Sequence, residues 1–173
     1  MATLSKVRQK EIDAVIEEVK LRSGLSYPEN TLLDLAGAVG VTVYEADLST
    51  IGPNISGLIE YADNKKKTEP KIFINDTINA KRKVFTLAHE LGHHFLHEGR
   101  KLRVDNLDYS RKDRDTEEEV EANYFAASLL VPKDIFMYKL AEEDTSLSDL
   151  ATYFGVSLPV IENRLRWVSA NGM

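Results

Sequence analysis

Two histidines four residues apart, with a glutamate directly after the first, give the strongest chemical signal in this sequence. They stand in the segment FTLAHELGHHFLHEG, residues 85–99, as His89, Glu90 and His93. On a helix, residues at this spacing share one face and lie about 6 Å apart along the axis. Two such imidazoles can bind one Zn²⁺, and the carboxylate can take a proton from a water that attacks a carbonyl. The pattern therefore predicts a zinc site with His89 and His93 as ligands and Glu90 as catalytic base.

The same segment favours a metal site over an amphipathic helix that carries histidines by coincidence. All four histidines of the chain lie between residues 89 and 97, and Gly92 stands inside the predicted helix. Glycine costs about 1 kcal/mol there relative to alanine, so we expect it to allow another backbone to pack closely. His97 follows His89 by eight residues, or about 12 Å of helix, which is too far for both to bind one ion. His94 points away from this face, and we expect it at the surface or in packing contacts.

The third ligand must come from elsewhere in a chain that has no cysteine. The predicted helix TEEEVEANYFAASLLVP, residues 116–132, is a natural source, because some zinc peptidases use two histidines and one glutamate. Its helical phase puts Glu119 at the edge of the apolar face, with Asn123 on the same side. The Asn123 amide oxygen could accept a proton from the second nitrogen of a ligand histidine. We favour Glu119 as the ligand, while Glu118 and Glu121 stay open as alternatives.

Composition places these residues in an ordinary globular chain. The 173 residues are 43% hydrophobic and 29% charged, which is typical of one folded domain. We expect an N-terminal helix (1–29), a catalytic core (30–132) and a C-terminal helical segment (133–173). The net charge of −6 disfavours nucleic acid or an anionic membrane as a partner. No segment has the pattern of a signal peptide or a membrane span, so we expect a cytoplasmic protein.

Hydrophobic periodicity predicts helices in both halves of the chain. We expect them near residues 5–22, 31–40, 78–97, 116–130, 133–143, 147–156 and 158–168, with Asn30 capping the second.

Three short stretches are typical of strands: 41–46, 57–62 and 71–75. The last two flank a polar turn and could form a hairpin. Either could be an exposed edge that pairs with an extended peptide, and an ordinary core hairpin is an equal alternative. The highly charged stretch 99–118 is expected to be an exposed loop, either a solvated connector or a lid over the site. Together these elements predict an α+β fold, in which a small, mainly antiparallel sheet packs on a zincin-type active-site helix beside a C-terminal helical lobe.

FTLAHELGHHFLH, followed by EVEANYFAASLLVP, resembles the ImmA/IrrE family of zinc metallopeptidases. GLIEYA with KIFIN resembles the family's strand pair, and LSDLATYFGVSLPVIENRL its C-terminal helices, so the resemblance covers roughly residues 30–168. It implies Zn²⁺ as the cofactor, His89, His93 and Glu119 as its ligands, and Glu90 as the base. It also implies an endopeptidase, from a phage, a mobile element or a stress-response locus, that cleaves a helix-turn-helix transcriptional repressor.

Several alternatives stay open at the level of the sequence. The chain could be a non-proteolytic binding module, such as an anti-repressor or antitoxin-like protein, that keeps the zinc site. The C-terminal helices look like a helix-turn-helix, with Arg164 and Arg166 on the second helix, but we expect a packing lobe and no direct DNA binding. Mn²⁺ or Fe²⁺ can occupy similar sites. The residue that stabilises the transition state is not assigned, and Tyr124 and Arg82 are candidates.

Overall fold

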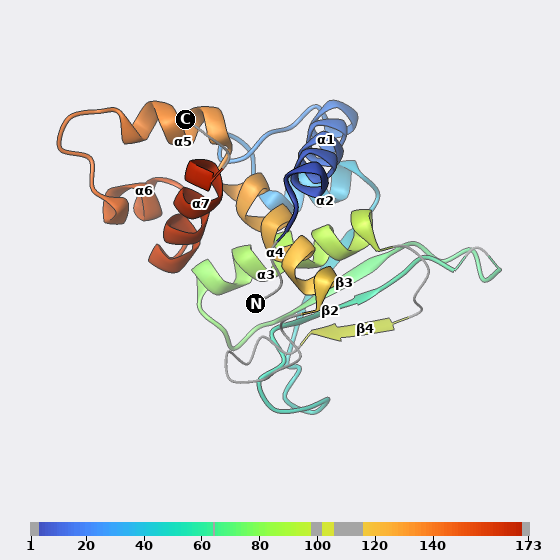
Figure 1. The fold of residues 1–173 in the computed structure, drawn as a ribbon. Coiled ribbons are helices and arrows are strands. Elements are labelled where there is room, and N and C mark those ends of the chain that lie inside the picture. Colours follow the sequence, from blue (N-terminus) through green and yellow to red (C-terminus); the bar gives the residue numbers. More distant parts are fainter. Residues whose placement is uncertain (1–3, 64, 98–101, 106–115, 171–173) are drawn as a thin grey trace.

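The computed structural model describes residues 4–63, 65–97, 102–105 and 116–170. In this part of the chain there are seven helices and four strands (Figure 1). The helices are α1 (Lys6–Ser23), α2 (Leu32–Ala38), α3 (Ala80–Leu96), α4 (Glu117–Leu130), α5 (Lys133–Leu140), α6 (Leu147–Tyr153) and α7 (Leu158–Ala170). The strands are β1 (Thr42–Ala46), β2 (Gly57–Glu60), β3 (Lys71–Asn75) and β4 (Leu102–Asp105). The α+β class expected from the sequence is confirmed.

The four strands form one mixed sheet in the order β1-β3-β2-β4. Strand β2 pairs antiparallel with β3 and with β4, whereas β1 runs parallel to β3. The predicted hairpin of β2 and β3 is therefore confirmed, and the sheet is mainly antiparallel. Of the two alternatives left open for these strands, the core hairpin is the one observed, because β1 and β4 flank β3 and β2 on either side.

Strand β4 corrects the expectation that residues 99–118 form an exposed loop. Residues 102–105 pair with β2, with Leu102 opposite Glu60 and Asp105 opposite Gly57. A four-residue strand among charged neighbours carries too little pattern to be recognised, because strand formation depends strongly on the partner strand. Residues 98–101 and 106–115 lie outside the described residues. The question of whether this stretch is a connector or a lid concerns those residues.

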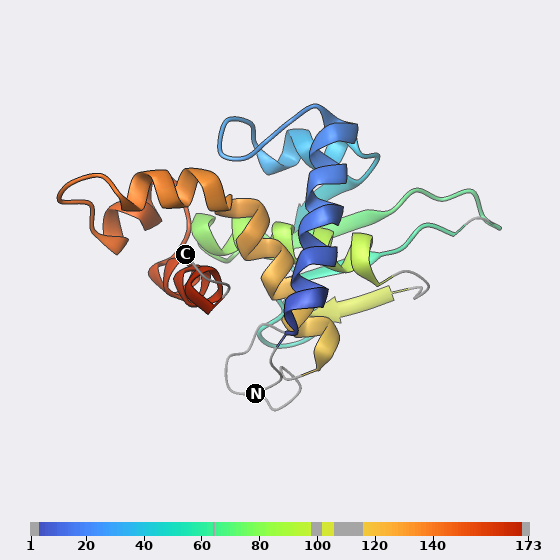
Figure 2. The same ribbon diagram turned by 45° about the horizontal axis from the view of Figure 1, so that its top comes forward.

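The two faces of the sheet are covered differently. Ile59, Ile72 and Ile74 belong to the main core, on the face against which α3 packs through β2 and β3. Leu58 lies in a second, smaller cluster with Leu48 and Ile55, two residues of the segment between β1 and β2. The alternation follows from the period of two along a strand. Figures 1 and 2 show α3 lying over the sheet, with α4 beyond α3 and α1 against α4.

Helix starts follow ordinary capping chemistry. The Asn79 side chain accepts a hydrogen bond from the Arg82 backbone N–H at 3.0 Å, so α3 begins at Ala80. For α2 the expected cap Asn30 is wrong. The cap is Thr31, whose hydroxyl oxygen accepts from the backbone N–H of Asp34 at 3.2 Å.

The C-terminal helices pack onto the catalytic half through α4 and α7. Arg164 of α7 is buried, and its Nε donates to the Val131 backbone carbonyl at 2.9 Å. Its Nη1 donates to the Ser128 hydroxyl oxygen at 2.8 Å. Arg164 therefore fastens α7 to the end of α4 and does not face solvent, whereas Arg166 is exposed. Among the described helices none is both long and apolar enough to cross a membrane.

Helices α3 and α4 approach closely at Gly92, as expected from the glycine inside the helix. A Cβ atom built on Gly92 would lie 3.1 Å from the Cα atom of Ala122 and 3.2 Å from both its carbonyl oxygen and the Cβ of Phe125. These distances are shorter than ordinary van der Waals contacts of a Cβ atom, and two of the three atoms belong to the α4 backbone. The absence of a side chain at residue 92 therefore sets the separation of the two helices.

We expect Gly92→Ala to lower the free energy of unfolding by about 1–3 kcal/mol, because α4 must move away to accommodate the methyl group. The matched control is Gly37→Ala in α2, where an added Cβ meets no atom within 4 Å. That variant should raise the same free energy by up to about 1 kcal/mol, through helix propensity. Urea denaturation of both variants measures the difference. Equal stability of the two would contradict the packing role of Gly92.

Candidate metal centre

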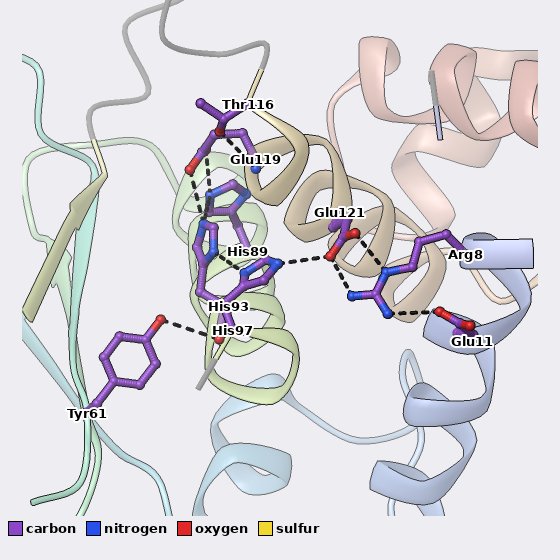
Figure 3. Close-up of polar contacts among 9 residues, drawn as sticks. All are labelled: Arg8, Glu11, Tyr61, His89, His93, His97, Thr116, Glu119 and Glu121. Carbon is purple, nitrogen blue, oxygen red and sulfur yellow. Dashed lines mark hydrogen bonds and ion pairs between the residues drawn. The ribbon is translucent and has the colours of Figure 1, made fainter. Parts of the chain in front are cut away.

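Three side chains from two helices converge on one point beneath the surface. The Nε2 atoms of His89 and His93 lie 3.0 Å apart. Nε2 of His89 lies 3.4 Å from Oε2 of Glu119, and Nε2 of His93 lies 3.4 Å from Oε1 (Figure 3). Both imidazoles are fully buried, whereas the Glu119 side chain is 15% exposed. One donor atom from each residue lies within 4.8 Å of the others, so the three could hold a metal ion.

The local sequence explains why these side chains meet. His89 and His93 lie one turn apart on the buried face of α3. Glu119 lies in the first turn of α4, where a carboxylate is favoured by the helix dipole. The hydroxyl oxygen of Thr116 accepts from the Glu119 backbone N–H at 3.3 Å and caps the helix. The cap fixes the start of α4, and the packing at Gly92 brings that start against α3.

A hydrogen bond defines the tautomer of the first histidine. Nδ1 of His89 lies 3.0 Å from the amide oxygen of Asn123, one turn after Glu119 on α4. An amide oxygen only accepts, so His89 carries its proton on Nδ1. Its Nε2 therefore presents a lone pair to the cluster. This is the contact that helical phase predicts for Asn123.

A longer chain of contacts defines the tautomer of the second histidine. Nδ1 of His93 lies 2.8 Å from Nδ1 of His97, and Nε2 of His97 lies 3.0 Å from a Glu121 carboxylate oxygen. The hydrogen bonds from Arg8 hold the pKa of Glu121 below its usual range, so this group accepts. Burial lowers the pKa of His97, although its hydrogen bond to Glu121 acts in the opposite direction. A neutral His97 donates to Glu121 and accepts from His93, which leaves a lone pair on Nε2 of His93.

Three electron-pair donors thus face one another in a largely buried place. Two imidazole lone pairs and a carboxylate repel each other, and the low effective dielectric of the interior strengthens that repulsion. A cation at their common point turns the repulsion into attraction. The donors are imidazole nitrogen and carboxylate oxygen, a set that suits divalent transition metals. The residues present therefore fit a metal ion.

Glu90 follows His89 directly and lies against the sheet, beside β2. It is fully buried, and an added Cβ on Gly57 would lie 2.9 Å from its Oε1 atom and 2.5 Å from Cγ2 of Thr86. Gly57 is the first residue of β2, so the sheet leaves room for the carboxylate only because this position lacks a side chain. Tyr61, just after β2, lies on the same side, with its hydroxyl donating to the His93 backbone carbonyl at 3.4 Å (Figure 3).

The other residues considered from the sequence fall outside the cluster. His97 ends α3 as its C-cap and contacts His93 through the ring nitrogen that faces away from the cluster. Glu121 contacts His97 instead of the cluster, and Glu118 is likewise not part of it. The ring of His94 packs on Phe95, with centroids 4.7 Å apart.

The two candidates for transition-state stabilisation have other partners. The Tyr124 hydroxyl donates to the Asp13 carboxylate of α1 at 3.1 Å, and its ring packs on Trp167 of α7. Tyr124 therefore faces α1 and α7 and does not face the cluster. Nε of Arg82 donates to the Ser56 hydroxyl oxygen at 3.0 Å, next to Gly57.

Sequence reasoning missed three residues that shape the site. Thr116 could have been found, because Thr followed three residues later by Glu is a known start signal for helices. Gly57 and Arg8 carry no local signal. Their roles depend on residues about 30 and 113 positions away in the chain.

A family model matches most of the chain, including the residues of this cluster. The model Peptidase_M78, described as an IrrE N-terminal-like domain, matches residues 36–166. The match spans well over half of the 173 residues, so the chain belongs to this family. The resemblance to ImmA/IrrE proteins is thereby confirmed. A comparison with curated proteins gives no match.

We expect Glu119→Ala to weaken zinc binding by more than about 100-fold, because loss of a ligand should exceed the 10–100-fold typical of residues behind the ligands. The matched control is Glu117→Ala, which removes an exposed glutamate from the same helical turn. Isothermal titration of the metal-free protein with zinc measures both affinities. The assignment of Glu119 is wrong if the two variants bind zinc equally well.

Proposed function

We propose that this chain is a zinc-dependent endopeptidase that hydrolyses a peptide bond in a protein substrate. The observation that carries the proposal is the convergence of two imidazole lone pairs and a carboxylate in a member of a peptidase family. Four ligands at about 2.0–2.1 Å from zinc in a tetrahedron stand about 3.3–3.4 Å apart. Nε2 of His89 lies 3.4 Å from Oε2 of Glu119, and Nε2 of His93 lies 3.4 Å from Oε1, so each imidazole has that spacing to a different carboxylate oxygen. The Nε2 to Nε2 distance of 3.0 Å is slightly shorter.

In this proposal His89, His93 and Glu119 hold the ion, and their neighbours hold the ligands. Asn123 keeps the His89 proton on Nδ1, and His97 does the same for His93. Three protein ligands leave a fourth position for water or substrate, as in other catalytic zinc sites. When bound, zinc lowers the pKa of a water to about 7 and polarises a carbonyl.

Glu90 is the proposed base. As the residue after His89, it stands beside the two histidines on α3, in the space left by Gly57. Its carboxylate takes a proton from the attacking water and passes that proton to the leaving amine, so the base is regenerated in each cycle. Full burial keeps bulk water away from this proton transfer.

Strand β4 is the proposed place for the substrate backbone. It is an edge of the sheet and pairs with β2, the strand whose Gly57 lies against Glu90. The other edge, β1, is separated from β2 by β3. Among the described strands β4 has no partner on the side away from β2, where an extended peptide could pair with it. The proposed substrate, a helix-turn-helix transcriptional repressor, rests on the family resemblance alone.

We expect Glu90→Gln to lower kcat by about 100- to 10,000-fold while zinc stays bound, because the amide cannot accept the proton. The matched control is Glu117→Gln, which removes the same charge from an exposed position and should leave the rate unchanged. Cleavage is measured by mass spectrometry, on a peptide library and on a helix-turn-helix repressor chosen as the candidate substrate. Zinc content is measured on the same samples.

Two results would separate the alternatives. A wild-type protein that binds zinc, cleaves no peptide in the library and still binds the repressor would favour the non-proteolytic binding module. Cleavage of library peptides without cleavage of the repressor would leave the peptidase intact and remove only the proposed substrate.

A further inference from the structure

The metal centre is connected to the N-terminal helix by an unbroken series of contacts. From His93 the series passes through His97 and Glu121 to Arg8 of α1 (Figure 3). We propose that Arg8 is a positioning residue that sets the metal affinity of the site by orienting Glu121, and through it the His97 and His93 imidazoles. This inference rests on the proposed function, because it assumes that His93 is a metal ligand.

The contact between Arg8 and Glu121 has the geometry of a rigid clamp. Nε and Nη2 of Arg8 donate to the two different carboxylate oxygens of Glu121, each at 2.7 Å. A bidentate pair of this kind fixes the plane of the carboxylate as well as its position. The third nitrogen, Nη1, donates to Glu11 one turn further along α1 at 3.0 Å, which restrains the guanidinium itself. The Glu121 side chain is only 7% exposed, so water has little access to loosen the clamp.

The clamp acts on the metal centre through directed hydrogen bonds. One Glu121 oxygen, Oε2, accepts from both Arg8 and His97, so the position of this atom determines where the His97 ring lies. Nδ1 of His97 in turn accepts the hydrogen bond from Nδ1 of His93, at 2.8 Å. Partners behind a metal-ligating histidine fix its tautomer and ring orientation, and their loss weakens metal binding by about 10- to 100-fold.

Helix α1 lies outside the part of the chain that matches the family model, which begins at residue 36. It is nevertheless well anchored, because Ile12 and Ile16 are buried in the main core and α1 packs on α4. The Arg8 backbone is therefore held in place, and the clamp joins residues 113 positions apart. The geometry thus assigns α1 a part in the metal centre as well as in the core.

We expect Arg8→Met to weaken zinc binding by about 3- to 10-fold, because Glu121 loses its fixed orientation. This is less than the roughly 10- to 100-fold typical of a direct partner of a ligand histidine, since Arg8 acts through Glu121 and His97. Arg8→Lys keeps the charge but cannot form the bidentate pair, so it should restore only part of the affinity. The matched control is Arg22→Met on the same helix, where the arginine is exposed and its nearest Glu18 oxygen is 4.0 Å away. That variant should bind zinc within about 2-fold of wild type, as expected for a surface ion pair. Competition with a chromogenic chelator measures the affinities.

A double variant tests whether Arg8 acts through Glu121. In the background of Glu121→Gln, adding Arg8→Met should change the affinity by less than about 2-fold, because the connection is already broken. Fold losses that multiply would show that Arg8 acts by another route and would overturn the proposal.

Two further readouts separate positioning from general stability. The d–d absorption of the Co²⁺-loaded protein should change in Arg8→Met but not in Arg22→Met, since only the former disturbs a ligand. Thermal unfolding of the metal-free variants records any loss of stability.

If Arg8→Met does not fold, Arg8→Lys serves as the test instead, and wild-type zinc affinity in Arg8→Lys would then overturn the proposal. Zinc binding that is equal in Arg8→Met and wild type contradicts this inference alone, whereas a wild-type protein that binds no zinc contradicts the proposed function as well.

Discussion

Helices α3 and α4 can approach closely only because residue 92 has no side chain. At this contact an added Cβ would lie 3.1 Å from the Cα atom of Ala122. The approach presents Glu119 and Asn123, which lie on one side of α4, to the histidines of α3. Each contacts an imidazole across the gap, Asn123 at 3.0 Å and Glu119 at 3.4 Å, so both contacts depend on the separation of the two helices. The metal centre is therefore a consequence of helix packing, and its donors are as rigid as the core that holds the two helices.

The sheet makes a second, separate contribution where it packs against α3. Gly57 begins β2 and leaves the volume in which the Glu90 carboxylate lies. One helix thus presents ligands toward α4 and a candidate base toward the sheet, and each side requires a glycine on one partner. In this chain an added Cβ at Gly92 would come close to the α4 backbone, and one at Gly57 would come close to the Glu90 carboxylate.

The sequence predicts much of this site because most of the site residues lie close together in the chain. His89, Glu90 and His93 occupy one helical turn and its neighbour, and the phase of α4 suffices to prefer Glu119 over Glu118 and Glu121. The same local rules predict the helices and the hairpin of β2 and β3.

The features that the sequence does not predict depend on contacts between residues far apart in the chain. Strand β4 exists because β2 is beside it, and its own four residues carry no clear pattern. From its helical phase Glu121 is far from the apolar face, yet it is buried because α1 covers it and supplies Arg8. That contact joins residues 113 positions apart, and the hydrophobic periodicity of α1 and of α4 does not predict that these two side chains meet.

The central claim is that two imidazoles and one carboxylate bind a single ion at their common point. Diffraction at the zinc absorption edge, from crystals grown with one equivalent of zinc, tests it most directly. The account predicts one anomalous peak within about 2.0–2.2 Å of Nε2 of His89, Nε2 of His93 and a carboxylate oxygen of Glu119. A refined structure with no peak between these atoms, or with the zinc bound by other residues, would contradict it.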